Sequence, residues 1–248
     1  MPEVILDVSD GVALVTLNAP ERRNAMNATM AGELIDALTE VNENTAVGAT
    51  VIRGAGGHLC AGADRSDLVD AGNDPTAPEV FAGIGLVYDT FAKIDTLATP
   101  TIAAVRGYSV GAGVNLAMAA DLRIMATDAT LRAGFFGIGL HPGGGHFTLV
   151  GRAANRSTAA AMTAFGCDVH GDRAVELGLA WESLDDAAVE ERCLELARFA
   201  ARDPELARLA TPSLRAETVG GHYDVAAATR MERAAQMWTF RRKVDRGL

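Results

Sequence analysis

The chain has 248 residues, and 49% of them are hydrophobic, which is enough to build a large core without disulfides or metals. Its 22 Lys and Arg against 32 Asp and Glu give a net charge of −10, and no basic run resembles a nucleic-acid-binding patch. The cysteines Cys60, Cys167 and Cys193 are far apart and outside any metal-ligand spacing, so we expect reduced thiols and no metal site.

The first residues, MPEVILDVSDG, carry acidic side chains where an export signal carries basic ones. The most apolar part of the chain is interrupted by Asp121 and Arg123 before it reaches the roughly 18 residues of a membrane helix. We therefore expect a cytoplasmic protein with no membrane partner and no nucleic-acid partner.

Strand and helix patterns alternate through the first half of the chain. Alternating apolar residues at 4–8 and 12–17 predict two strands around a hairpin turn, Ser9-Asp10-Gly11. Apolar residues spaced by three and four at 30–41 predict an amphipathic helix. Beyond it we expect a strand at 49–53, a helix at 79–94, and strands at 101–105 and 122–126.

Helical patterns dominate after Arg152, with one strand-like interruption at 179–184. Two long Ala-rich segments without internal proline, 187–201 and 225–240, predict helices. Strand–loop–helix units followed by a helical tail predict a mixed α/β domain with an α-helical C-terminal part.

Two loops share one design, in which small residues follow an apolar strand and precede a helix: LCAGAD at 59–64 and GYSVGAG at 107–113. Small side chains let a ligand approach the backbone, and the first N–H groups of a helix point outward with the positive end of its dipole. Tight packing alone explains one such loop, whereas two together could place two donors on one oxygen. Neither loop carries a dinucleotide-binding or P-loop glycine motif.

Four stretches carry a family resemblance: NAPERRNAMN at 18–27, HLCAGADRSDL at 58–68, TPTIAAVRGYSVGAGVNLAMAADLRIMA at 99–126 and GIGLHPGGG at 137–145. Through them the chain resembles the enoyl-CoA hydratase/isomerase (crotonase) superfamily over nearly its whole length. The resemblance implies a spiral of repeated ββα units at 1–190 and a helical oligomerisation region at 191–248. It also implies an acyl-CoA substrate, no cofactor besides the coenzyme A of that substrate, and a homotrimer or homohexamer.

The resemblance further implies where the substrate binds. The backbone amides of Ala63 and Ala112 correspond to the oxyanion hole that holds the thioester carbonyl. Four positions correspond to coenzyme A contacts of the family: Ala25, Ala61, Asp64 and Arg65. Arg22 and Arg23 could neutralise phosphates, although a solvated loop explains both arginines equally well.

The chain departs from the family at the two glutamates that transfer protons in its hydratases. Asn115 and Phe135 stand at those positions, and neither an amide nor a phenyl ring transfers protons near neutral pH, so we expect little or no hydration. His141 is the first candidate for a substitute acid or base. The weaker candidates are His146, Tyr88 and Asp89.

These residues are compatible with three functions. The first is a lyase or isomerase of fatty acid metabolism that stabilises a thioester enolate. The second is other chemistry of the same family, isomerisation or thioester hydrolysis, with His141 as the base. The third is a non-catalytic acyl-CoA-binding protein. An acid or base within reach of the acyl α- or β-carbon separates the third from the first two, and the acyl chain itself stays open.

Overall fold

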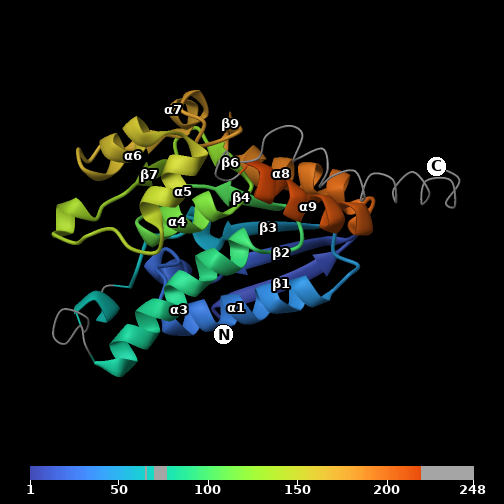
Figure 1. Ribbon diagram of the computed structural model, residues 1–248, viewed down its shortest axis with the longest axis horizontal. Coiled ribbons are helices and arrows are strands. Elements are labelled where there is room, and N and C mark those ends of the chain that lie inside the picture. The colour runs from blue at the N-terminus through green and yellow to red at the C-terminus, as the bar shows by residue number, and fades with distance from the viewer. Residues whose placement is uncertain (65, 70–76, 219–248) are drawn as a thin grey trace, which may run out of the picture.

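The computed structural model describes residues 1–64, 66–69 and 77–218 (Figure 1). The chain opens with a hairpin of β1 (Val4–Ser9) and β2 (Val12–Leu17), which pair antiparallel around Asp10 and Gly11. These two turn residues have positive φ, 50° and 75°. An Asp-Gly pair adopts this backbone at low cost, and the predicted hairpin is confirmed.

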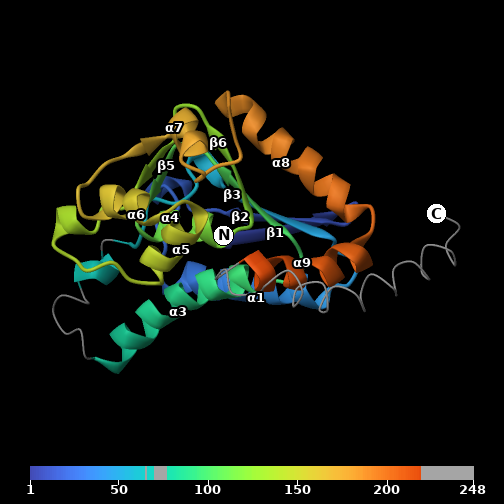
Figure 2. The same ribbon diagram turned by 45° about the horizontal axis from the view of Figure 1, so that its top comes forward.

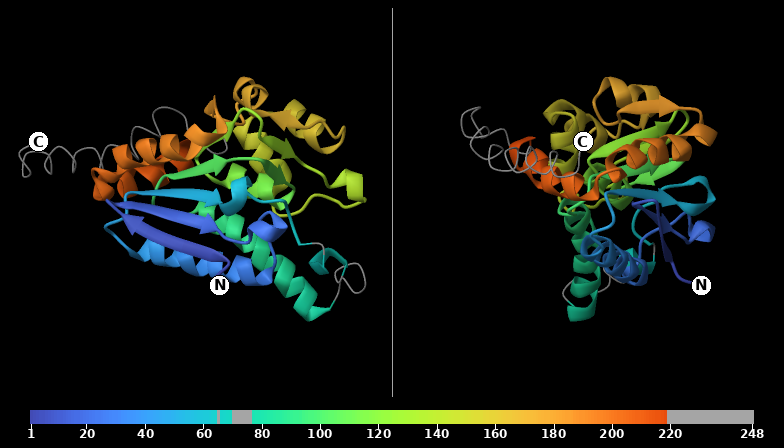
Figure 3. Two further views of the ribbon diagram at one scale, coloured as in Figure 1. Left: turned by 180° about the vertical axis from the view of Figure 1, so that it is seen from behind. Right: turned by 90° about the vertical axis from the view of Figure 1, so that its right-hand side faces the viewer.

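The main sheet has six strands in the order β1-β2-β3-β4-β6-β9. Its other strands are β3 (Ala49–Gly54), β4 (Thr101–Val105), β6 (Leu122–Ala126) and β9 (Glu182–Leu184). Every pair beyond the hairpin is parallel. All residues of β4 are buried, as expected for an apolar strand that is covered on both faces. Figure 3 shows the hairpin at the edge of this sheet.

A smaller sheet has the order β5-β7-β8 and comprises β5 (Tyr108–Val110), β7 (Thr130–Arg132) and β8 (Val169–His170). The sequence predicted a loop at 107–113, and the structure corrects this prediction. β5 is too short for its alternation to be visible in the sequence. It forms a strand because β7, from another part of the chain, supplies a parallel partner.

Helices cover both faces of the main sheet (Figure 2). α1 (Ala28–Glu43) and α3 (Pro78–Asp95) pack against each other, while α8 (Asp186–Ala201) crosses the opposite face against β3, β4 and β6. α1 begins after Asn27, whose Oδ1 accepts a hydrogen bond from the Met30 amide at 2.8 Å. The apolar face predicted for this helix is buried, and its large members are Met30, Leu34, Leu38 and Val41.

Shorter helices fill the space between these elements. They are α4 (Ala112–Ala119), α5 (His146–Ala153), α6 (Arg156–Thr163), α7 (Gly171–Glu176) and the 3₁₀ turns η1 (Pro20–Arg22), η2 (Ala55–Gly57) and η3 (Phe136–Ile138). Every residue of α4 after Ala112 is buried, so this helix lies in the core with its first residue at the edge. None of the helices in the described residues has the length and apolarity to cross a lipid bilayer.

The C-terminal helices α8 and α9 (Pro204–Thr218) pack on the body of the domain. Arg106, just after β4, pairs with Asp186 and, at 2.6 Å, with Glu190 of α8. Arg215 of α9 pairs with Asp121 at 2.6 Å. The boundary expected at residue 190 falls inside α8, and the helix expected at 225–240 lies outside the described residues.

Candidate active site

The two small-residue loops run side by side. Cys60 and Ser109 form a parallel bridge, and the Val110 amide donates to the Cys60 carbonyl at 3.1 Å. A Cβ on Gly113 would be 2.0 Å from the Cys60 carbonyl oxygen, and a Cβ on Gly62 would be 3.0 Å from that of Val110. Small residues are therefore needed where the loops touch.

A glycine with positive φ precedes each alanine that was expected to form the oxyanion hole. Gly62, before Ala63, has a φ of 105°, and Gly111, before Ala112, has a φ of 50°. Ala112 is the first residue of α4, so its N–H has no partner inside the helix. Among the backbone hydrogen bonds of the described residues, none is donated by Ala63. Adjacent loops thus present two N–H groups, each on a partly exposed residue.

Asn115 lies one helical turn after Ala112 and is 1% exposed. Its Nδ2 donates to the Gly143 carbonyl at 2.9 Å, and its Oδ1 is 2.8 Å from Nδ1 of His146. Nε2 of His146 lies 3.0 Å from the hydroxyl of Thr163 in α6. Both polar atoms of Asn115 are therefore engaged inside the protein.

These hydrogen bonds define one tautomer of His146. A carbonyl only accepts, so the amide nitrogen of Asn115 faces Gly143 and its oxygen faces His146. Nδ1 of His146 then donates, and Nε2 accepts from the Thr163 hydroxyl. Burial disfavours the imidazolium and lowers the pKa of His146 to about 4, so the ring is neutral at physiological pH. His146, one of the weaker candidates from the sequence, is a buried partner of Asn115.

Phe135 is the residue expected, from the family resemblance, at the position of the second glutamate. Its ring packs edge-on against His146 with centroids 4.9 Å apart. A Cβ on Gly111 would lie 3.7 Å from Cζ of Phe135, so the ring also borders the start of α4. The Phe135 side chain thus makes apolar contacts beside the start of α4 and offers no group that transfers protons.

His141 lies in an exposed stretch between η3 and α5. Its Nδ1 is 2.7 Å from the Pro142 carbonyl oxygen, and its ring packs edge-on against Phe147 with centroids 6.1 Å apart. In the described part of the chain, these contacts join His141 to its own loop and to α5, not to Asn115. Asp89, another weaker candidate, is exposed on α3.

The segments expected to contact coenzyme A form a short backbone ladder. The Ala61 amide donates to the Arg23 carbonyl at 3.0 Å, and the Asp64 amide donates to the Met26 carbonyl at 2.8 Å. The ladder brings Ala25 alongside the first small-residue loop, and Ala25, Ala61 and Asp64 are all partly exposed. The structure therefore joins two segments that the sequence could only match separately.

Asp64 is held by its neighbours. The Ser66 hydroxyl and backbone N–H donate to its Oδ1 at 2.7 and 2.9 Å, and these bonds, with the charge of Arg22 nearby, lower the pKa of the carboxyl. Asp64 thus stays ionised. Arg65, also expected to contact coenzyme A, lies outside the described residues.

The two arginines before this ladder have different surroundings. Arg22 donates to the Ala25 carbonyl at 2.9 Å and pairs with Glu3 at 2.5 Å. Arg23 is exposed, and its guanidinium carbon lies 5.9 Å from the centroid of the Tyr108 ring. Arg22 therefore holds the loop together, and Arg23 is the one that presents a cation to solvent.

Asn24 is a residue whose role the sequence did not indicate. It is 0% exposed, and its Oδ1 accepts from the Ala19 amide at 2.9 Å. Its Nδ2 donates to the carbonyls of Ala55, at 2.9 Å, and His58, at 2.7 Å. One side chain thus ties the turn at η1 to the turn at η2. In the sequence, Asn24 is marked only by its place in the NAPERRNAMN motif. The motif does not show that the Asn24 side chain bonds carbonyls more than 30 residues away.

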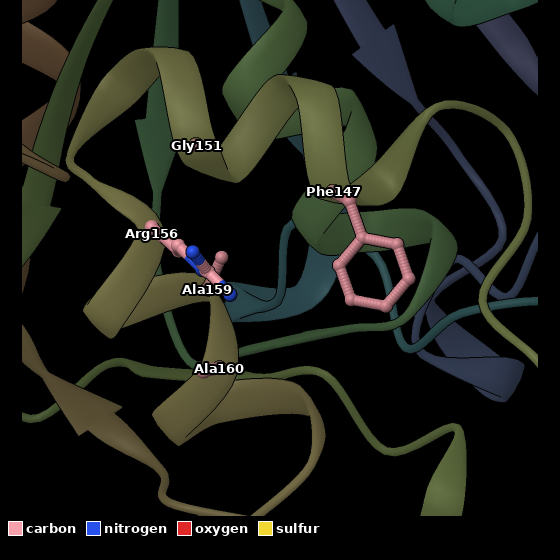
Figure 4. A pocket seen from close by; sticks show the side chains of 5 residues that line it. All are labelled: Phe147, Gly151, Arg156, Ala159 and Ala160. Atoms are coloured by element: carbon pink, nitrogen blue, oxygen red, sulfur yellow. The ribbon is translucent and has the colours of Figure 1, made fainter.

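A groove of about 420 Å³ lies between α5 and α6 (Figure 4). It is lined by Phe147, Gly151, Arg156, Ala159 and Ala160. None of the residues expected to bind substrate lines it. Within the described residues, no three His, Cys, Asp or Glu side chains gather in a way that could hold a metal ion.

Solved structures share this architecture. An enoyl-CoA hydratase of Bacillus anthracis superposes with a TM-score of 0.85 at 26% identity, covering 95% of this chain and 90% of its own. An enoyl-CoA hydratase of Polaromonas has a TM-score of 0.85 at 26% identity and covers 97% and 91%. The protein therefore has the crotonase fold, with repeated strand–helix units and C-terminal helices.

Sequence comparison identifies the family. The enoyl-CoA hydratase/isomerase model matches residues 7–240. A probable enoyl-CoA hydratase of Mycobacterium tuberculosis is 40% identical over 223 residues, which cover 90% of this chain and 85% of the relative. The 1,2-epoxyphenylacetyl-CoA isomerase of Escherichia coli is 34% identical over 208 residues, which cover 82% and 78%. The chain belongs to the enoyl-CoA hydratase/isomerase family.

Proposed function

We propose that this protein is an acyl-CoA-processing enzyme that stabilises a thioester enolate between the backbone amides of Ala63 and Ala112. The observation that carries this proposal is the contact between the two loops, with a positive-φ glycine directly before each alanine. Two donors aimed at one oxygen stabilise it most when negative charge develops there. Because both donors belong to the main chain, the replacements at Asn115 and Phe135 leave them in place.

Ordinary hydration is not part of this proposal. Adding water to an enoyl thioester needs a base and an acid, each worth about 10²–10⁴ in rate. Phe135 supplies neither, and both side-chain polar atoms of Asn115 are already hydrogen-bonded, one to Gly143 and one to His146. We favour an enolate reaction without water addition, such as isomerisation, and the similarity to a 1,2-epoxyphenylacetyl-CoA isomerase supports this choice. A reaction that uses His141 as base, whether isomerisation or thioester hydrolysis, would require its exposed loop to turn toward Asn115.

A non-catalytic acyl-CoA-binding protein is the second candidate. The observation that favours it is the buried network of Asn115, His146 and Thr163, in which every side-chain polar atom of Asn115 and His146 has a partner inside the protein. A protein of this kind would keep the two amides and the Arg23 cation, and would return its ligand unchanged.

Calorimetric titration with butyryl-CoA and crotonyl-CoA tests the shared part of both candidates. Ala112→Pro removes one N–H, and proline is well tolerated at the first residue of a helix; Ala63→Pro removes the other. We expect both variants to bind more weakly than the wild type, and Ala112→Gly, which keeps the donor, to match it. If no thioester binds below millimolar concentration, the proposal is wrong.

Product analysis then separates the two candidates. Mass spectrometry after incubation with a panel of enoyl- and acyl-CoAs detects any conversion, and loss of one oxyanion donor typically lowers a rate by about 10²–10³. Conversion that falls by this factor in Ala112→Pro supports the enzyme. Binding without conversion of any thioester supports the binding protein.

We also propose that the chain assembles as a homotrimer or homohexamer. α8 and α9 carry large apolar side chains on their surface, with Phe199 72% exposed; the others are Leu206, Leu209 and Leu214. A second copy that covers them would remove this area from water. Light scattering at micromolar concentration measures the mass, and a monomer would contradict this proposal.

A further inference from the structure

The side chains around the start of α4 leave few polar groups for an acyl chain. Asn115 and His146 are 1% exposed and bonded within the protein, and Phe135 is apolar. The two backbone amides explain how a thioester carbonyl could be held, but they do not explain how the acyl group beyond it would be recognised.

Tyr88 of α3 lies directly on the backbone of the glycine-rich segment. A Cβ on Gly143 would be 2.1 Å from its hydroxyl oxygen and 2.8 Å from Cζ, and a Cβ on Gly144 would be 3.0 Å from Cδ1. Gly143 has no positive φ, so its own backbone does not call for glycine. The approach of the tyrosine does, because any side chain at residue 143 would displace the phenol.

Gly143 links Tyr88 to the candidate site. Its carbonyl accepts the hydrogen bond from Asn115, which lies one turn after Ala112 on α4. The Tyr88 hydroxyl is therefore separated from Asn115 by one glycine, and the buried ring of Phe91, also on α3, borders Gly144. α3 and α4 pack against each other and hold Tyr88 beside this segment.

The Tyr88 hydroxyl is available to a ligand. The residue is 42% exposed, and in the described part of the chain its hydroxyl has no hydrogen-bond partner. A phenol hydroxyl both donates and accepts. It is thus a protic side chain beside the glycine-rich segment, without an internal partner of the kind that engages Asn115 and His146.

We propose, building on the proposed function, that Tyr88 is a specificity-determining residue whose hydroxyl hydrogen-bonds an oxygen substituent on the acyl group. The preferred substrates are then acyl-CoA thioesters that carry a hydroxyl or other oxygen on the chain, rather than plain alkyl thioesters. A hydroxyl that bonds an oxygen of the acyl group favours the thioester that carries this oxygen, because the analogue that lacks it cannot form the hydrogen bond.

Calorimetry with butyryl-CoA and its 2-, 3- and 4-hydroxy derivatives tests this inference. One neutral hydrogen bond corresponds to a preference of about threefold to tenfold, so we expect the wild type to bind at least one hydroxy derivative that much more tightly than butyryl-CoA. Tyr88→Phe removes only the hydroxyl. It should abolish the preference and change butyryl-CoA binding less than about twofold.

Two further variants keep the test sharp. Gly143→Ala retains the hydroxyl but pushes the phenol aside, so it should also lose the preference. Tyr108→Phe is the control: it removes the hydroxyl of a second tyrosine, on β5, that is also 42% exposed. This variant should keep the preference for the hydroxy derivative. A preference that survives Tyr88→Phe, or equal binding of all four thioesters by the wild type, overturns the role of Tyr88 alone. If none of the four binds, the proposed function fails and this inference fails with it.

Discussion

Replacing His146 by glutamine tests the buried network through its dependence on pH. His146 is neutral in the folded protein, where burial lowers its pKa from 6.5 to about 4. Between these two values the unfolded chain binds a proton that the folded protein does not, so stability falls as the pH drops through this window. This difference in pKa corresponds to about 3 kcal/mol, of which about 2 kcal/mol is lost by pH 5.

Glutamine can donate to Asn115 and accept from Thr163, but it does not titrate. Urea unfolding at pH 7.5 and pH 5.0, at one protein concentration, gives the loss of stability for each protein. We expect the wild type to lose about 2 kcal/mol more than His146→Gln, since all other groups titrate in both. His141→Gln, at an exposed position, is the control and should follow the wild type. Equal losses for the wild type and His146→Gln would refute the neutral buried histidine.

The arginines and the glycines provide two further predictions. Arg23→Ala should weaken coenzyme A thioester binding in a salt-dependent way while leaving the melting temperature unchanged, because its charge faces solvent; Arg22→Ala should instead lower the melting temperature, because it removes the bonds to Glu3 and Ala25. An equal effect of both on binding, measured by calorimetry, contradicts this division. Gly111→Ala should lower the free energy of unfolding, measured in urea, by about 1–3 kcal/mol. A Cβ there meets no atom closer than 3.5 Å, so the loss comes from strain in the backbone, at φ 50° and ψ −105°. Gly85→Ala in α3, where a Cβ meets open space, should stabilise the protein by about 0.5–1 kcal/mol, and a loss there would show that helix packing is the larger effect.

The sequence by itself determined the elements whose signals are local. The strands at 101–105 and 122–126 and the helix over α1 follow from apolar runs and periodicity within the segment, and the structure confirms them. The small residues of the two loops also predicted close approach to the backbone, because contact between main chains needs glycine or alanine wherever it occurs. The motifs were specific enough to identify the family that the comparisons confirm.

Tertiary structure alone decided which groups meet. β5 is a strand because β7 lies beside it, and Arg22 is paired because Glu3 is folded against it, whereas Arg23, the next residue, lies over the Tyr108 ring. Asn115 could be placed by its spacing from Ala112, but its partners Gly143 and His146 are far along the chain. Local periodicity carries no information on such contacts, because they depend on how distant segments pack. The direction of the Asn115 amide, and with it the polarity of the candidate site, therefore came only from the fold.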